Sequence, residues 1–124
     1  MGGLLAGVEK RLVAYVLIVG DCGLVSHVTG FLNPVDVPAS WVEAMWPVEP
    51  LHYVSHATPA ALLYQAALRD QAVAIANAVR YQRAGSAPKR IMWYDTDHWL
   101  NDQAWQDQQA WLEPFIGIGS GESR

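Results

Sequence analysis

Cysteine and long apolar runs are scarce in this chain of 124 residues. Its single cysteine, Cys22, cannot form an internal disulfide, which excludes a disulfide-stapled secreted scaffold and a thiolate-rich metal site. The longest apolar run, residues 12–19, is far shorter than the roughly 18 residues needed to cross a bilayer. We therefore expect no membrane partner and a cytoplasmic location.

Charge is also scarce, and basic charge most of all. Eight Lys and Arg residues stand against twelve Asp and Glu residues, a formal net charge of -4. Nucleic-acid binding relies on a basic surface, so we expect no nucleic-acid partner. Hydrophobic residues make up 52% of the chain and charged residues only 16%, against about 25% in a typical domain, which excludes disorder and predicts that much of the chain is buried. We expect one domain over residues 1–118 and a flexible tail at 119–124.

Three apolar segments have the composition of buried strands. Residues 12–19 form a continuous β-rich run that stops at Gly20, as expected for a strand covered on both faces. Residues 60–66 follow Pro59, and residues 90–94 follow Pro88. The pattern predicts three short strands separated by breakers.

Helical periodicity lies between and after these strands. Residues 72, 75, 76 and 79 predict a crossover helix that stops at Gly85, and Asn101 or Asp102 can cap a last helix ending near Pro114 and Gly117. Residues 21–39 read as a long loop, followed by short helices at 40–46 and 48–56. Alternation of strands and helices predicts the α/β class, with a three-stranded parallel sheet and flanking helices.

Two polar residues lie just beyond the ends of predicted strands. Asp70 comes four residues after the second strand, and His98 comes four residues after Tyr94 in the third. Loops at the carboxyl edge of a parallel sheet converge, so the two side chains are expected to meet there. A carboxylate that bonds one imidazole nitrogen leaves the other free as a general base.

Several segments resemble the α/β-hydrolases, in particular the dienelactone-hydrolase-like and acyl-peptidase-like esterases. The residues that carry the resemblance are Gly2–Glu9 (GGLLAGVE), Leu62–Gln65 (LLYQ), Arg69–Val73 (RDQAV), Trp93–Asp95 (WYD) and His98. Gly2–Glu9 resembles the helix that follows a nucleophile elbow. The resemblance covers the C-terminal half of that fold, and it implies that Asp70 is the catalytic acid and His98 the catalytic base.

The nucleophile of such an enzyme is not present in the 124 residues. No G-x-S-x-G motif occurs, so the resemblance implies the C-terminal part of a serine hydrolase of carboxylic esters that is inactive alone. Such a truncation leaves the first strand without a neighbour on one side. We expect that edge to bind a second copy or a complementary N-terminal hydrolase piece. A small-molecule ester is the expected substrate, with no cofactor and no metal.

Other functions remain open at this stage. Cys22, Trp41, Trp46 and Trp99 are candidates for lining an apolar pocket, which suits a non-catalytic oligomerising or small-molecule-binding module. Cys22 is more simply a buried structural thiol than a nucleophile served by His98. His52 and His56 have the spacing of two zinc ligands on a helix, but no third ligand is evident.

Overall fold

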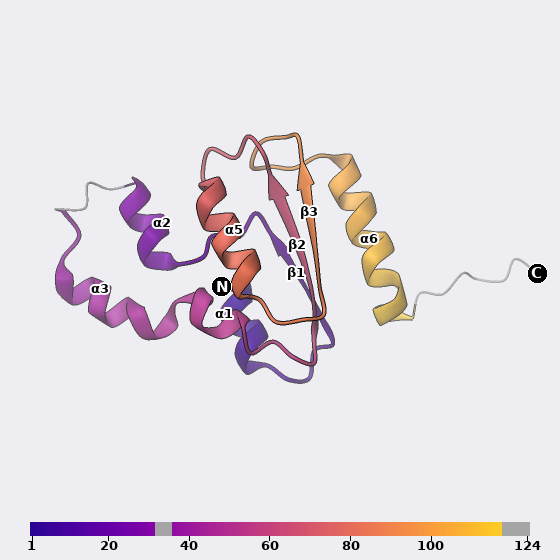
Figure 1. Cartoon of the computed structure of the whole chain (residues 1–124), viewed down its shortest axis with the longest axis horizontal. Helices are drawn as coiled ribbons and strands as arrows, with labels where there is room; N and C mark the ends of the chain where they lie inside the picture. Colours follow the sequence, from indigo (N-terminus) through magenta and orange to yellow (C-terminus); the bar gives the residue numbers. More distant parts are fainter. Residues whose placement is uncertain (32–35, 118–124) are drawn as a thin grey trace, which may run out of the picture.

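A three-stranded parallel sheet forms the centre of the computed structural model, which describes residues 1–31 and 36–117. The strands are β1 (Ala14–Ile18), β2 (Ala61–Ala67) and β3 (Lys89–Tyr94), in the order β1-β2-β3 (Figure 1). Pairing runs from Ala14 opposite Ala61 to Ile18 opposite Gln65, and from Leu62 opposite Lys89 to Ala67 opposite Tyr94. The predicted fold class is confirmed.

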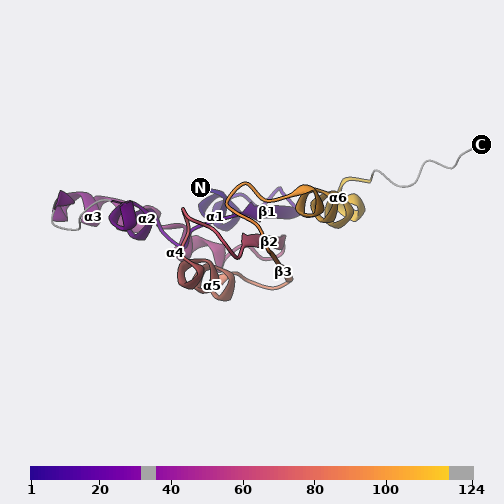
Figure 2. The ribbon, with the colours of Figure 1, turned by 90° about the horizontal axis from the view of Figure 1, so that it is seen from above.

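Helices cover both faces of this sheet. The described helices are α1 (Gly2–Val8), α2 (Leu24–Phe31), α3 (Ala39–Met45), the 3-10 helix η2 (Trp46–Val48), α4 (Pro50–Val54), α5 (Ile75–Ala84) and α6 (Asp102–Ile116). Of these, α2 and α3 extend away from the sheet, at the left of Figure 1. Seen from above, α1, α4 and α5 lie on one side of the strands and α6 on the other (Figure 2). The chain crosses from β1 to β2 through α2, α3, η2 and α4, and from β2 to β3 through α5.

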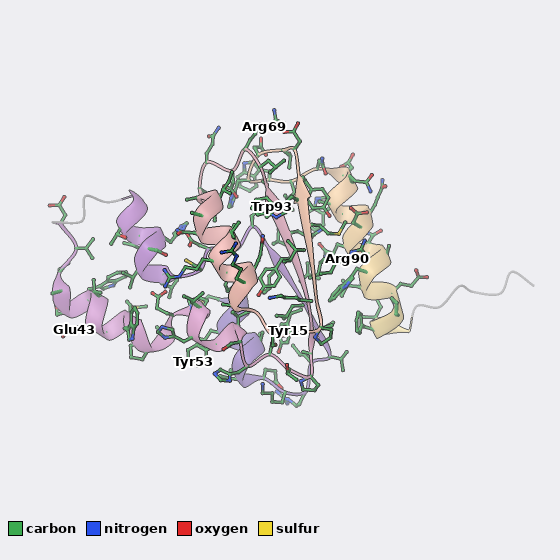
Figure 3. All side chains as sticks on the ribbon, viewed as in Figure 1. Tyr15, Glu43, Tyr53, Arg69, Arg90 and Trp93 are labelled. Atoms are coloured by element: carbon green, nitrogen blue, oxygen red, sulfur yellow. The ribbon has the colours of Figure 1, made fainter. Side chains whose placement is uncertain are left out.

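The strands differ in how completely they are buried. Every residue of β2 is buried, as a central strand requires. In β1, Tyr15 (labelled in Figure 3) and Leu17 are buried under α1, whereas Ile18 on the opposite face is 36% exposed. Helix α6 packs on β1 and β2 on that face, where Ala14 and Val16 are half-buried. The expectation that the first strand is covered on both faces is therefore wrong at its carboxyl end, where Ile18 is exposed.

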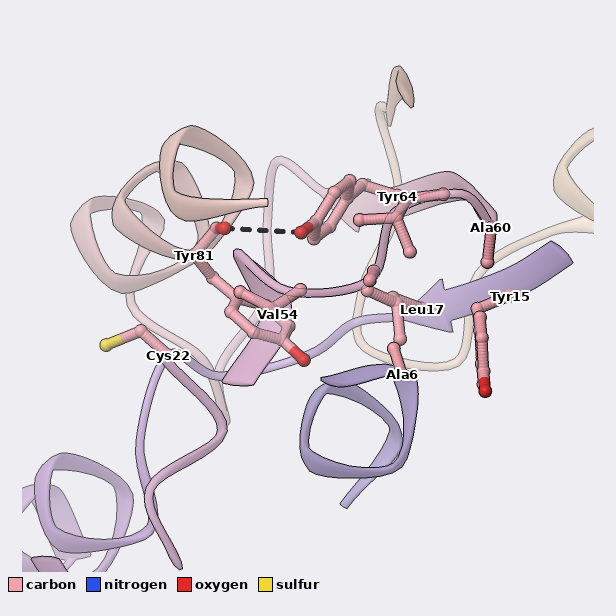
Figure 4. Close-up of a cluster of buried hydrophobic side chains, with 10 residues drawn as sticks. Ala6, Tyr15, Leu17, Cys22, Val54, Ala60, Tyr64 and Tyr81 are labelled. Carbon is pink, nitrogen blue, oxygen red and sulfur yellow. Dashed lines mark hydrogen bonds between the residues drawn. The ribbon is translucent and has the colours of Figure 1, made fainter. Parts of the chain in front are cut away.

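The main core lies between the sheet and α1, α4 and α5 (Figure 4). Tyr64 of β2 and Tyr81 of α5 pack edge to face with ring centroids 5.4 Å apart, and the Tyr64 hydroxyl donates to the Tyr81 carbonyl oxygen at 3.4 Å. Burial raises the pKa of both phenols, so they stay neutral hydrogen-bonding groups inside an otherwise apolar cluster.

Part of the segment expected to be a long loop, residues 21–39, is helical. Helix α2 (Leu24–Phe31) was not predicted from the sequence, and its first turn is held by a residue far along the chain. The Glu49 side chain is buried, and its Oε1 accepts the N–H of Val25 at 2.7 Å. A carboxylate at a helix N-terminus satisfies a free N–H and interacts favourably with the helix dipole.

One predicted helix boundary moves, and another is confirmed. The crossover helix α5 begins at Ile75, because Ala72 belongs to a turn around Asp70 described below. Helix α6 continues through Pro114 and ends at Ile116, with Gly117 in the left-handed conformation at its C-terminus. The short helices expected at 40–46 and 48–56 correspond to α3 and α4, joined by η2.

The predicted tail at 119–124 lies outside the described residues. Among the helices of residues 1–31 and 36–117, none is long and apolar enough to cross a membrane.

Close contact between α1 and α4 gives a test of this packing. A methyl group at Gly7 would overlap the main-chain carbonyl of Tyr53, which cannot move alone, whereas one at Gly2 would meet only the Leu17 side-chain end at 2.9 Å. We expect Gly7→Ala to lower the free energy of unfolding by about 1–3 kcal/mol, with a smaller effect for Gly2→Ala. Urea unfolding of both variants measures this, and equal stabilities would contradict the packing.

Candidate functional site

Asp70 and His98 meet at the carboxyl edge of the sheet. The His98 Nδ1 lies 2.9 Å from Oδ1 and 3.0 Å from Oδ2 of Asp70. The Asp70 side chain is 4% exposed, whereas that of His98 is 34% exposed. The two loops that carry them leave the ends of β2 and β3 beside Arg69, labelled at the top of Figure 3. The structure therefore brings together the two residues that the sequence singled out.

The Asp70 carboxylate is fixed by the main chain that follows it. Its Oδ1 accepts the N–H groups of Ala72 at 2.8 Å and Val73 at 2.9 Å. These bonds form a turn of the kind that aspartate side chains make with their own backbone, and α5 starts only afterwards, at Ile75. The carboxylate thus stabilises a turn and at the same time faces the imidazole.

This arrangement selects one form of the imidazole. An ionised carboxylate only accepts hydrogen bonds, so the proton of neutral His98 belongs on Nδ1. The lone pair is then on Nε2, and no residue in the described ranges makes a hydrogen bond with that atom. The half-exposed ring can therefore take a proton from a group that approaches from solvent.

A second set of bonds holds the two loops together. The Arg69 main-chain N–H donates to the Thr96 carbonyl at 3.0 Å, and its guanidinium donates to the Asp95 carbonyl at 2.9 Å. The same guanidinium lies 3.1 Å from Oδ1 of Asp95. Leu68 donates to the Tyr94 carbonyl at 2.9 Å, so the parallel ladder continues past both strands toward the site.

The loop after His98 is also fixed locally. The N–H of Trp99 donates to Oδ1 of Asp97 at 3.0 Å, and Leu100 adopts a positive φ of 59°. The Asn101 side chain then accepts the N–H of Ala104 at 3.1 Å and caps α6, as the sequence predicted. His98 is therefore held between a fixed strand end and a capped helix.

The four candidate pocket residues do not share one pocket. Cys22 and Trp46 line a hollow of about 310 Å³ beside α2 and α4, together with His52, which packs edge to face with Trp46 at 4.7 Å. Trp41 does not line it, and Trp99 lies in the His98 loop. The single pocket fails because Cys22 follows β1 and Trp99 follows β3, at opposite edges of the sheet.

Cys22 is a poor candidate for a nucleophile. The residue is 2% exposed, and its sulfur lies 3.6 Å from the Ser26 hydroxyl. Burial raises the pKa of its thiol, which disfavours the reactive thiolate. The prediction that this thiol is buried is confirmed.

Sequence reasoning missed a second pair of an acid and a histidine. Nδ1 of His27 in α2 lies 3.1 Å from Oδ2 of Asp21, which follows the end of β1. These residues and Ser26 share a hollow of about 210 Å³ with Asp70. The rule that predicted Asp70 and His98 applies equally to Asp21, since it also lies beyond a strand end. The sequence predicted a long loop over a possible site at residues 21–39, but it gave no partner for His27.

The different burial of two aspartates beside His98 gives a prediction. Asp70→Ala leaves the N–H groups of Ala72 and Val73 without their acceptor and is expected to cost about 1–3 kcal/mol of folding free energy. Asp95→Ala, at a side chain 79% exposed, is expected to cost less than about 1 kcal/mol. Thermal unfolding measures both. Equal losses would mean that the Asp70 bonds contribute no more than a surface ion pair.

Comparison with known proteins finds a likeness to a solved structure. No protein-family model matches the chain, and no curated protein matches it. Among solved structures, it is similar to the crystal structure of an esterase domain from a Rhodothermus marinus protein, with a TM-score of 0.62 and 22% sequence identity. The match covers 93% of this chain and 53% of that one, so the chain spans about half the length of its structural neighbour. At this identity the likeness shows the fold, which is esterase-like.

Proposed function

We propose that this chain is the acid-and-base portion of a serine-type carboxylic-ester hydrolase, of the dienelactone-hydrolase-like or acyl-peptidase-like kind. The observation that carries the proposal is the contact between the buried Asp70 carboxylate and His98 Nδ1. The esterase-like fold supports it, because Asp70 and His98 follow successive strands in the order expected for the acid and base of that fold.

The chemistry would be acyl transfer. Nε2 of His98 takes the proton of a serine hydroxyl as that oxygen attacks the ester carbonyl, and then returns it to the leaving alkoxide. Asp70 keeps the imidazole in the tautomer with Nδ1 protonated and stabilises the imidazolium that forms. Water repeats the sequence on the acyl-enzyme, with His98 again acting first as base and then as acid.

The serine and the donors for the developing oxyanion would come from residues outside these 124, since no G-x-S-x-G motif is present. A hollow of about 260 Å³ supports the proposal that another segment completes the enzyme. It is lined by Met1 and Gly2 at the start of α1, by Val16 and Ile18 of β1, and by Asp21. A strand beside β1 that leads toward α1 would fill this space. Without it, the chain is expected to have no esterase turnover.

The free edge of β1 is the proposed contact for a complementary N-terminal hydrolase piece or for a second copy of the chain. The Val13 carbonyl accepts from Ala61 and the Val19 N–H donates to Gln65, both on β2. Backbone groups alternate in direction along a strand, so the N–H and carbonyl of Val16 point away from β2. Unpaired groups of this kind readily pair with another strand.

A non-catalytic binding module is the second candidate. The hollow of about 310 Å³ beside Cys22 and Trp46 favours it, because it lies apart from Asp70 and His98 and combines aromatic and polar walls. In that case Asp70 and His98 would only stabilise the two loops, and their removal would leave binding intact.

A chimera tests the hydrolase proposal. We expect the segment of the Rhodothermus marinus esterase domain outside the matched half, fused ahead of Met1, to give hydrolysis of p-nitrophenyl acetate. His98→Ala should then lower kcat by about 10⁴-fold or more, whereas His56→Ala, at an exposed residue, should leave kcat unchanged. Gel filtration and circular dichroism establish that each chimera is folded. A folded, active chimera that keeps its rate without His98 would refute the proposal.

Association through β1 has a separate test. Val16→Pro removes an N–H from the free edge without removing a bond to β2, since proline is tolerated on edge strands. We expect light scattering to show an oligomer for the unmodified chain at high concentration and a monomer for this variant, with unchanged circular dichroism. A clean monomer for the unmodified chain would exclude self-association through this edge.

A further inference from the structure

Trp99 is an apolar side chain in an unusual position. Its residue is 82% exposed, the highest fraction of any large hydrophobic residue in the described part of the chain. It follows His98 directly, and the indole and imidazole lie edge to face with ring centroids 6.0 Å apart and planes at 85°. An indole in water leaves much apolar surface uncovered, and this one lies against the ring of the candidate base His98.

The exposure of Trp99 occurs on a tightly bonded loop. Its own N–H is held by Oδ1 of Asp97, and the N–H of Leu100 is held by the Asp97 carbonyl at 3.1 Å. Arg69 ties the start of the same loop to the Asp70 turn. These bonds fix the backbone that carries the indole and hold it near the imidazole. A fixed side chain loses less conformational entropy when a ligand binds than one on a loose loop.

We propose that Trp99 forms the apolar wall of the substrate subsite at His98, and that the substrates are uncharged esters with an aromatic or bulky apolar group. This inference rests on the proposed hydrolase function. Nε2 of His98 must lie within hydrogen-bond reach of the reacting oxygen. The indole centroid lies 6.0 Å from the imidazole centroid, so a bulky group bonded close to the reacting ester is long enough to reach the indole.

The charges around Trp99 narrow the substrate class. Asp97 is exposed and its carboxylate accepts the main-chain N–H of Trp99, and Asp95 is 79% exposed beside Arg69. An anionic group on the substrate would be repelled by the Asp97 carboxylate and would gain little from Arg69, which is already paired. Neutral esters therefore fit this rim better than carboxylate-bearing ones.

Binding to the isolated chain tests the wall, because a chain without a nucleophile is expected to leave an ester intact. The probe is phenyl butyrate, followed by the NMR signals of the Trp99 indole N–H and the His98 ring. We expect both signals to shift together and to saturate. Trp99→Ala should raise the Kd about tenfold, and Trp99→Phe should retain most of the affinity. Trp105→Ala, at an indole 49% exposed on α6, is the matched control and should leave the Kd unchanged.

Two results would overturn the inference: the absence of a saturable shift at Trp99, or equal Kd values for Trp99→Ala and Trp105→Ala. Benzoate, an anionic aromatic compound, should bind more weakly than phenyl butyrate, and tighter binding would refute the charge selectivity.

The outcome is separable from that of the hydrolase proposal. In an active chimera that depends on His98, Trp99→Ala should raise KM for phenyl butyrate more than for ethyl acetate. Equal changes in the two KM values would reject the wall and leave the hydrolase function standing. If phenyl butyrate binds saturably at Trp99 but the chimera keeps its rate without His98, the hydrolase proposal is rejected and the binding site at Trp99 stands.

Discussion

The site depends on the parallel pairing of β2 with both of its neighbours. β2 is buried along its whole length, so its backbone groups have no access to water and must bond to β1 and β3. The pairing of Ala67 with Tyr94 aligns the ends of β2 and β3, and the bonds from Leu68 and Arg69 extend this alignment by two residues. Asp70 and His98 meet because the strands that precede them cannot slip.

The bonds around this site differ in strength because they differ in exposure. The Asp70 carboxylate is almost completely buried, and a buried charge must be compensated; two main-chain N–H groups and an imidazole supply that compensation. The Arg69 and Asp95 side chains form their ion pair in solvent, where it contributes about 0–1 kcal/mol. The main-chain bonds are therefore the basis of the geometry, and the ion pair is an accessory.

Much of the fold could be predicted from local sequence patterns, because buried strands require continuous apolar segments. Continuous apolar runs stopped by glycine or proline predicted three parallel strands, and Asn101 predicted the start of α6. The positions of Asp70 and His98 predicted their meeting because parallel strands share a carboxyl edge. Whether they act in catalysis stays a prediction. Helix α2 could not be found in this way, because the N–H of Val25 is satisfied by Glu49, a residue on another segment.

The sequence by itself determined the class of fold, the order of its strands along the chain and the two side chains that could meet at one edge, because these depend on composition and on spacing along the chain. The tertiary structure alone decided how far each strand is covered, where α2 and α5 begin, and which aromatic side chains share a hollow with Cys22. Those features depend on contacts between residues far apart in the chain. A local sequence pattern does not show which distant group will accept a hydrogen bond from a given N–H or pack against a given ring.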